Sequence, residues 1–336
     1  FAICLTRLIM KVILALTLLF FIFFSSTFAQ KSKHGSKTVS GVEIVNEYTS
    51  LVSDAAIGET TLEVVNSGLN TNGRFSGNLE EGDLLYIIQM QGVTIESADT
   101  GSFSWGEIIA YNNCGLHEYA EVSGVSNGTT IELSCPLRNN YQASGKVNVI
   151  RVPRYADLSI PLNQTLTGEA WNGNEGGVIV VEVEGDVTVE GEIEMDAKGF
   201  RGTEGSTNNN GGGLYAFNEY ATTVHDIGAL KGEGIAGYHT DYDTLGGRFG
   251  QGAAANAGGG GVSLNAGGGG GSNVGDISIY EGWGVPDRTS DPNYSTAWTL
   301  EGNKRSIGID TVSSSGGGRG GYTLSDNSED PLTLAP

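Results

Sequence analysis

The chain has 336 residues, of which 39 are acidic and 18 are basic, giving a formal net charge of −21. This negative field repels phosphate backbones, so the composition excludes nucleic acid as a partner. The length is sufficient for two domains.

The first thirty residues are typical of a secretory signal peptide. A basic start precedes an apolar run over residues 12–24, and small residues ending at Ala29 supply a cleavage site. The run is shorter than the roughly 20 residues that a transmembrane helix needs. We therefore expect a signal peptide over residues 1–29, with Met10 as the true start. We also expect secretion to the extracellular space or the cell surface, with no transmembrane helix in the mature chain.

A disordered leader and a β domain are predicted after the signal peptide. Residues 30–45 are polar and basic, which predicts the disordered leader. From 46 to 157, short alternating segments separated by turns predict a small antiparallel β-barrel or sandwich domain. The clearest element is a hairpin over residues 122–134, where Asn127 and Gly128 suit a type I′ turn.

Two cysteines follow the signal peptide, Cys114 and Cys135. In an oxidising compartment, a disulfide between them would close a loop of about 20 residues and stabilise the fold by about 3 kcal/mol. Two free thiols are the alternative, and the sequence leaves the choice open. The spacing does not match a zinc site.

Glycine becomes abundant near residue 158, which marks the start of a predicted glycine-rich β domain over 158–336. In residues 176–199, apolar side chains alternate with glutamates, and the pattern is broken at Gly185-Asp186 and Glu190-Gly191. These breaks are typical of the corners of a β-solenoid rung or of a tight meander, with the apolar side chains inside. The whole chain is therefore predicted to be all-β.

One later segment repeats this pattern. Gly275–Ile279 reads Gly-Asp-Ile-Ser-Ile, which matches Gly185–Val189, Gly-Asp-Val-Thr-Val, position by position. A single match does not define a repeat period, so the sequence favours a β-solenoid without excluding the meander.

The glycine tracts allow two interpretations. Short glycine runs commonly form flexible linkers. Here aliphatic residues such as Val262 and Leu264 interrupt the tracts, and such residues need a surface to pack on. This favours ordered glycine loops or polyglycine segments that approach closely because no Cβ intervenes. The tracts lie at 208–213, 258–261, 267–271 and 316–321.

No catalytic motif is present in the sequence, so we predict a non-enzymatic protein. The glutamates of 182–194 are typical of a solvated strand face. The histidines accompany no nucleophile motif and lie at His34, His117, His225 and His239. The tryptophans could stack on sugar rings, although a buried position is favoured for each: Trp105, Trp171, Trp283 and Trp298.

Calcium is the one cofactor that the sequence admits. Asp241 and Asp243 form one acidic segment, and Asp326, Glu329 and Asp330 form another. Carboxylate oxygens in such segments are suitable calcium ligands, but neither segment has the spacing of an EF-hand. The alternative is a hydrated acidic turn.

Glycine-containing motifs follow the predicted domain boundary: Leu166-Thr167-Gly168, Trp171-Asn172-Gly173, residues 176–181 and Ala197 to Gly202. They resemble the large exported glycine-rich surface proteins of gliding bacteria, many of them gliding-motility-associated or adhesin-like, over roughly residues 45–322. The resemblance implies a secreted protein with a C-terminal sorting domain and no defined catalytic residues. The sequence lacks that domain, so we expect truncation at the C-terminus.

Three functions are consistent with these observations. The first is a secreted or cell-surface adhesin or structural protein, whose partner is a cell-surface or extracellular polysaccharide or protein. The second is a passive spacer in a surface filament. The third is a β-solenoid polysaccharide-degrading enzyme, which would carry acidic and basic side chains along one solenoid face.

Overall fold

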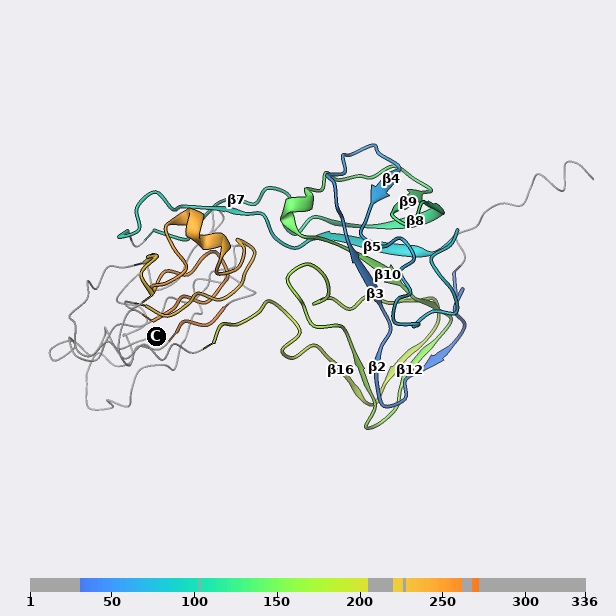
Figure 1. Cartoon of the computed structure of the whole chain (residues 1–336). Helices are drawn as coiled ribbons and strands as arrows, with labels where there is room; N and C mark the ends of the chain where they lie inside the picture. Colours follow the sequence, from blue (N-terminus) through green and yellow to red (C-terminus); the bar gives the residue numbers. More distant parts are fainter. Residues whose placement is uncertain (1–30, 103, 205–219, 226–227, 262–267, 272–336) are drawn as a thin grey trace, which may run out of the picture.

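The computed structural model describes residues 31–102, 104–204, 220–225, 228–261 and 268–271. Figure 1 shows an antiparallel sheet, a stack of short parallel strands beneath it, and a glycine-rich lobe to one side. Strands dominate, and the helices in these residues are short 3₁₀ turns, including η1 (Ala143–Gly145) and η3 (Asp241–Leu245). The all-β prediction is confirmed. In the described part of the chain, no helix is long and apolar enough to span a bilayer.

A six-stranded antiparallel sheet forms most of the first predicted domain. Its order is β3 (Glu47–Ser50), β10 (Val147–Val152), β5 (Leu84–Gln89), β8 (His117–Ser126), β9 (Thr130–Leu133) and β4 (Thr61–Glu63). β8 and β9 form the predicted hairpin, and both turn residues have positive φ, 56° at Asn127 and 74° at Gly128. One face of the sheet covers a core that includes Leu85, Ile87 and Val149.

Short parallel strands stack into the rungs of a solenoid. The first rung holds β1 (Lys37–Thr38) and β2 (Val42–Ile44). The second rung holds β11 (Arg154–Tyr155), β12 (Leu158–Ile160) and β13 (Thr165–Thr167), and the third holds β14 (Glu182–Val183), β15 (Val187–Val189) and β16 (Glu192–Glu194). Strands at equivalent positions of neighbouring rungs pair in parallel.

The predicted corners of the third rung are confirmed. Gly185-Asp186 separates β14 from β15, and Glu190-Gly191 separates β15 from β16. Glycine is required at the second corner, because a Cβ on Gly191 would lie 2.2 Å from the carbonyl oxygen of Gln164. The local sequence therefore determines where each short strand ends.

The prediction of a disordered leader over 30–45 is wrong for β1 and β2, which pair with β12 and β13. Val39 and Val45 anchor this segment, since they are 1% and 5% exposed and pack in the solenoid core. Two separate valines in a polar segment do not form an alternating pattern, so the sequence gives no strand signal there. The antiparallel sheet is consequently an insertion between the first and second rungs.

The glycine-rich lobe consists of extended segments that bond directly to one another. The Gly232 N–H donates to the Gly258 carbonyl at 2.9 Å. A Cβ on Gly258 would lie 2.1 Å from the Gly269 oxygen, so only glycine permits this approach. Ordered glycine segments are thus confirmed for 258–261 and 268–271. The tracts 208–213 and 316–321 lie outside the described residues.

An arm extends from the sheet to this lobe (Figure 1). It contains β6 (Thr94–Ile95) and β7 (Ile108–Ala110), which pair antiparallel. Trp105, between them, is fully buried, and its indole N–H donates to the Leu245 carbonyl at 2.9 Å. Arm and lobe therefore share one apolar core, which also includes Tyr242, Ala254 and Ala255.

Candidate functional site

Three aromatic side chains form a row on the face of the sheet opposite its main core. Tyr86 lies directly across from Tyr119, and Ile88 lies across from His117. Because alternate residues of a strand share a face, Tyr86, Tyr119 and His117 lie on the same surface. The Tyr86 ring centroid is 5.0 Å from that of Tyr119 and 5.5 Å from that of His117. We call these three residues the aromatic row.

The row is accessible to solvent. Tyr119 is 57% exposed, His117 is exposed, and Tyr86 is half-buried between them. Burial raises the pKa of Tyr86, with a smaller contribution from Tyr119. Its phenol is therefore protonated at neutral pH and can donate a hydrogen bond. An aromatic surface with polar edges results, which is suited to ligands that are partly apolar and partly hydroxylated.

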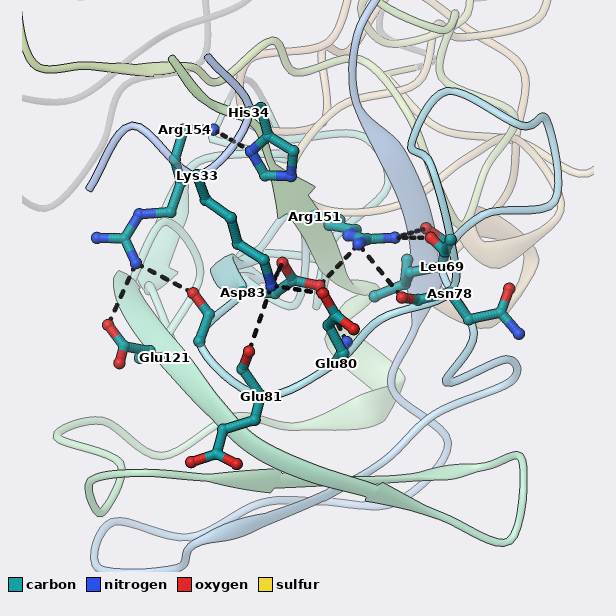
Figure 2. A network of polar contacts seen from close by, with 12 residues as sticks. Lys33, His34, Leu69, Asn78, Glu80, Glu81, Asp83, Glu121, Arg151 and Arg154 are labelled. Atoms are coloured by element: carbon teal, nitrogen blue, oxygen red, sulfur yellow. Dashed lines mark hydrogen bonds and ion pairs between the residues drawn. The ribbon is translucent and has the colours of Figure 1, made fainter. Parts of the chain in front are cut away.

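A fixed carboxylate borders the row. Glu121 follows Tyr119 on the same face of β8, and Arg154 Nη1 donates to it at 3.3 Å (Figure 2). The same guanidinium donates from Nε to Glu182 on the third rung at 2.5 Å. Arg154 is 2% exposed, so these bonds hold the edge of the sheet against the solenoid.

A buried ion network stabilises the junction beneath this border (Figure 2). The carboxylate of Asp83 is fully buried and accepts hydrogen bonds from Lys33 Nζ and Arg151 Nη2, both at 2.7 Å. The Arg151 guanidinium also lies over the Phe75 ring, 3.9 Å from its centroid. Burial lowers the pKa of Arg151, and the Asp83 charge opposes this effect. Each charge is paired, which indicates a structural role for the network rather than proton transfer.

The two predicted calcium ligands of the described chain have protein partners. Asp241 accepts the Tyr238 N–H at 2.9 Å, and Asp243 accepts from Arg248 Nε at 2.9 Å. The hydrogen bond from Arg248 lowers the pKa of Asp243. No group of three or more His, Cys, Asp or Glu side chains suited to a metal occurs among the described residues. The second predicted segment, Asp326, Glu329 and Asp330, lies outside them, so calcium binding there stays a prediction.

Of the two possibilities left open for Cys114 and Cys135, a disulfide or two free thiols, the structure has the two free thiols. The strand register keeps the two thiols apart. The Ser134 N–H donates to the Glu121 carbonyl, so Cys135 lies near the Glu121 region of β8, whereas Cys114 lies before the start of β8 at His117. The extended strand from His117 to Glu121 is about 13 Å long, which exceeds the reach of a disulfide. Burial raises the pKa of Cys114 to about 12.

The tryptophans of the described chain are buried, as favoured by the sequence. Trp105 is fully buried, and Trp171 is 3% exposed and donates to Glu233 Oε1 at 2.9 Å. Trp283 and Trp298 lie outside the described residues. Glu190, Glu192 and Glu194 are exposed as predicted. The predicted burial of the apolar face is wrong at Val187, Val189 and Ile193, which are 53%, 47% and 52% exposed because no described strand stacks on the third rung.

Comparison with known proteins gives matches among solved structures alone: no family model matches, and no curated protein matches. The tailspike of Acinetobacter baumannii bacteriophage AP22, solved with a capsular saccharide, is 15% identical with a TM-score of 0.22, covering 46% of this chain and 21% of its own. The tailspike of Pseudomonas phage LKA1 is 15% identical, with a TM-score of 0.19, and the match covers 40% of this chain and 27% of the tailspike chain. The tailspike of Pseudomonas phage phi297 is 12% identical, with a TM-score of 0.21, and the match covers 47% of this chain and 34% of the tailspike chain.

Proposed function

We propose that the chain is a non-enzymatic, extracellular binding protein that holds a polysaccharide along the aromatic row. The exposed ring of Tyr119 beside Tyr86 and His117 carries the proposal. Aromatic faces can pack on the apolar faces of sugar rings, while phenol and imidazole edges bond to hydroxyl groups. The signal peptide expected over 1–29 would deliver this surface to the compartment where such polymers occur.

Charge favours a neutral polysaccharide over an acidic one, because the net charge of −21 repels polyanions. The carboxylate that borders the row has a structural partner: Glu121 accepts a hydrogen bond from Arg154, which also donates to Glu182. This arrangement fixes the edge of a binding surface. Together with the resemblance to surface proteins of gliding bacteria, this supports an adhesin or structural role at the cell surface.

Affinity electrophoresis of the full chain through gels containing neutral glucans, mannans or xylans tests the proposal. We expect at least one polymer to retard the protein. Tyr119→Ala should weaken this binding about tenfold, equivalent to about 1.4 kcal/mol, because it removes the exposed aromatic face.

Val125→Ala is the matched control, since Val125 is 37% exposed on the same strand. It should bind like the wild type. Migration unaffected by every polymer, or equal retardation of Tyr119→Ala and wild type, would refute binding at the aromatic row. Release of reducing ends from a retarding polymer would instead support the polysaccharide-degrading alternative.

A further inference from the structure

The strands that carry and border the aromatic row contain carboxylates but no lysine or arginine. Glutamates occur on β4, β8 and β9, at Glu63, Glu118, Glu121 and Glu132, and β5 has no charged residue. Glu121 follows Tyr119 on the same face of β8, about 7 Å along the strand. A ligand that extends from Tyr119 along β8 therefore meets negative charge.

The cation that pairs with Glu121 is turned inward. Arg154 is 2% exposed, and its Nη1 also donates to the Gly82 carbonyl at 3.2 Å. Because the same guanidinium pairs with Glu182, one positive charge serves two carboxylates and leaves an excess of negative charge. The Glu121 side chain is 26% exposed. A carboxylate has about four lone-pair sites, so Glu121 can accept a further donor from a ligand.

The row itself presents an acceptor and an aromatic face. His117 Nδ1 lies 3.0 Å from the Gly115 carbonyl oxygen. A carbonyl can only accept, so Nδ1 donates, and Nε2 of the neutral ring is left as an acceptor. The exposed ring of Tyr119 attracts cations through its quadrupole. These groups suit an ammonium ion, which has three donors and no acceptor.

We propose that the aromatic row binds an amino polysaccharide, a polymer in which protonated amines replace some of the sugar hydroxyl groups. A sugar ring stacked on Tyr119 would direct an amine at its edge toward Glu121. The ammonium ion would then contact both the carboxylate and the aromatic ring, whereas a hydroxyl or acetylated amine carries no charge for either. This specificity rests on the proposed function, since Tyr119 must first hold the sugar ring.

A lysine-rich peptide is the other cationic polymer that such a surface could attract. The rings of Tyr86 and Tyr119, with centroids 5.0 Å apart, favour the polysaccharide. Sugar rings are flat and already rigid, so they cover this surface at a low entropic cost. A lysine side chain would lose its rotamer freedom on the same surface. The net charge of −21 attracts polycations from a greater distance and adds no preference between the two.

Isothermal titration calorimetry of the full chain tests the specificity with glucosamine and N-acetylglucosamine oligomers of equal length. At a pH at which the amines are protonated, the glucosamine oligomer should bind about tenfold more tightly, as one exposed cation–π contact and one surface ion pair together provide. Added salt should reduce this difference, because the charges involved are exposed. The affinity for the N-acetylglucosamine oligomer should not depend on salt.

Glu121→Gln removes the charge and keeps a carbonyl acceptor for Arg154. We expect this variant to bind both oligomers with the affinity that the wild type has for the N-acetylglucosamine oligomer. Glu132→Gln is the matched control, because it removes an exposed carboxylate from β9, opposite Gly124. It changes the net charge equally and should keep the tenfold preference. Equal loss of the preference in both variants would overturn the role of Glu121.

The wild type alone can also refute the amine specificity, and it separates this failure from that of carbohydrate binding. Equal affinity for the two oligomers, with both weakened by Tyr119→Ala, overturns the specificity and leaves carbohydrate binding at the row intact. Absence of binding by the glucosamine oligomer overturns the specificity even if a neutral polymer retards the protein in gels. Oligolysine that binds as tightly as the glucosamine oligomer and displaces it would assign the surface to basic peptides instead.

Discussion

His34 is held as a neutral hydrogen-bond acceptor. Its Nδ1 accepts the Arg154 N–H at 2.9 Å, and its ring packs edge-on against Phe75 with centroids 5.1 Å apart. Burial lowers the pKa of His34 below 6.5, outweighing the opposing charge of Asp83. The unfolded chain therefore binds a proton more readily than the folded chain does. Stability from this group is complete above the unfolded pKa and is lost as pH falls through it toward the folded pKa.

We expect the free energy of unfolding to decrease between pH 7.5 and pH 5, as measured by urea denaturation. His34→Gln keeps an acceptor and does not titrate, so its stability should decrease less over the same interval. Carboxylate titrations are common to both proteins and cancel in the comparison. Parallel pH profiles for the two proteins would show that His34 is not the responsible group.

Single residues are predictable from the sequence where the signal is local. The turn at Asn127-Gly128 was predicted because both residues tolerate positive φ, which the structure shows. The aromatic row was missed, because strand alternation alone does not pair Tyr86 with Tyr119. For the same reason the sequence leaves the choice between a Cys114–Cys135 disulfide and two free thiols open, since strand register depends on pairings between distant segments.

At the scale of elements, the glycine segments of the lobe depend on the absence of a Cβ. Gly258→Ala would place a methyl group 2.1 Å from the Gly269 oxygen, so the backbones must separate. We expect a loss of about 1–3 kcal/mol in the free energy of unfolding, as for other overpacked sites. Hydrogen exchange at the Gly232 amide, which donates to Gly258, should increase in parallel.

Gly270→Ala is the matched control from the neighbouring segment. A Cβ there meets nothing within 4 Å, and its φ is not positive, so alanine should be neutral or slightly stabilising. Equal stability of the two variants would mean that the close backbone approach at Gly258 does not contribute to the lobe.

The elements themselves were predictable where a break in the pattern marks them. The corners at Gly185-Asp186 and Glu190-Gly191 were found because alternation stops there. The first-rung strands were missed because β1 and β2 span only Lys37–Thr38 and Val42–Ile44. Segments this short cannot show an alternation of apolar and polar residues. They are stabilised by pairing in parallel with β12 and β13, which are distant in sequence.

At the scale of the whole molecule, the fold is a solenoid interrupted by larger units. The antiparallel sheet is inserted between two rungs, and the sheet in turn extends the arm that packs in the glycine-rich lobe (Figure 1). The arm also bonds to the lobe through its backbone, since Ala255 N–H donates to the Gly106 carbonyl at 2.8 Å. The position of the lobe beside the sheet therefore depends on the arm core.

Trp105 is the largest side chain of that core, and Lys231 Nζ lies 4.5 Å from its ring centroid. Trp105→Ala removes this ring and the hydrogen bond to Leu245, so we expect a loss of about 3–5 kcal/mol. Limited proteolysis should then cleave the lobe before the sheet. Ile109→Ala, on the same arm but 51% exposed, should match the wild type. Equal protease resistance of lobe and sheet in Trp105→Ala would show that the lobe is held without the arm.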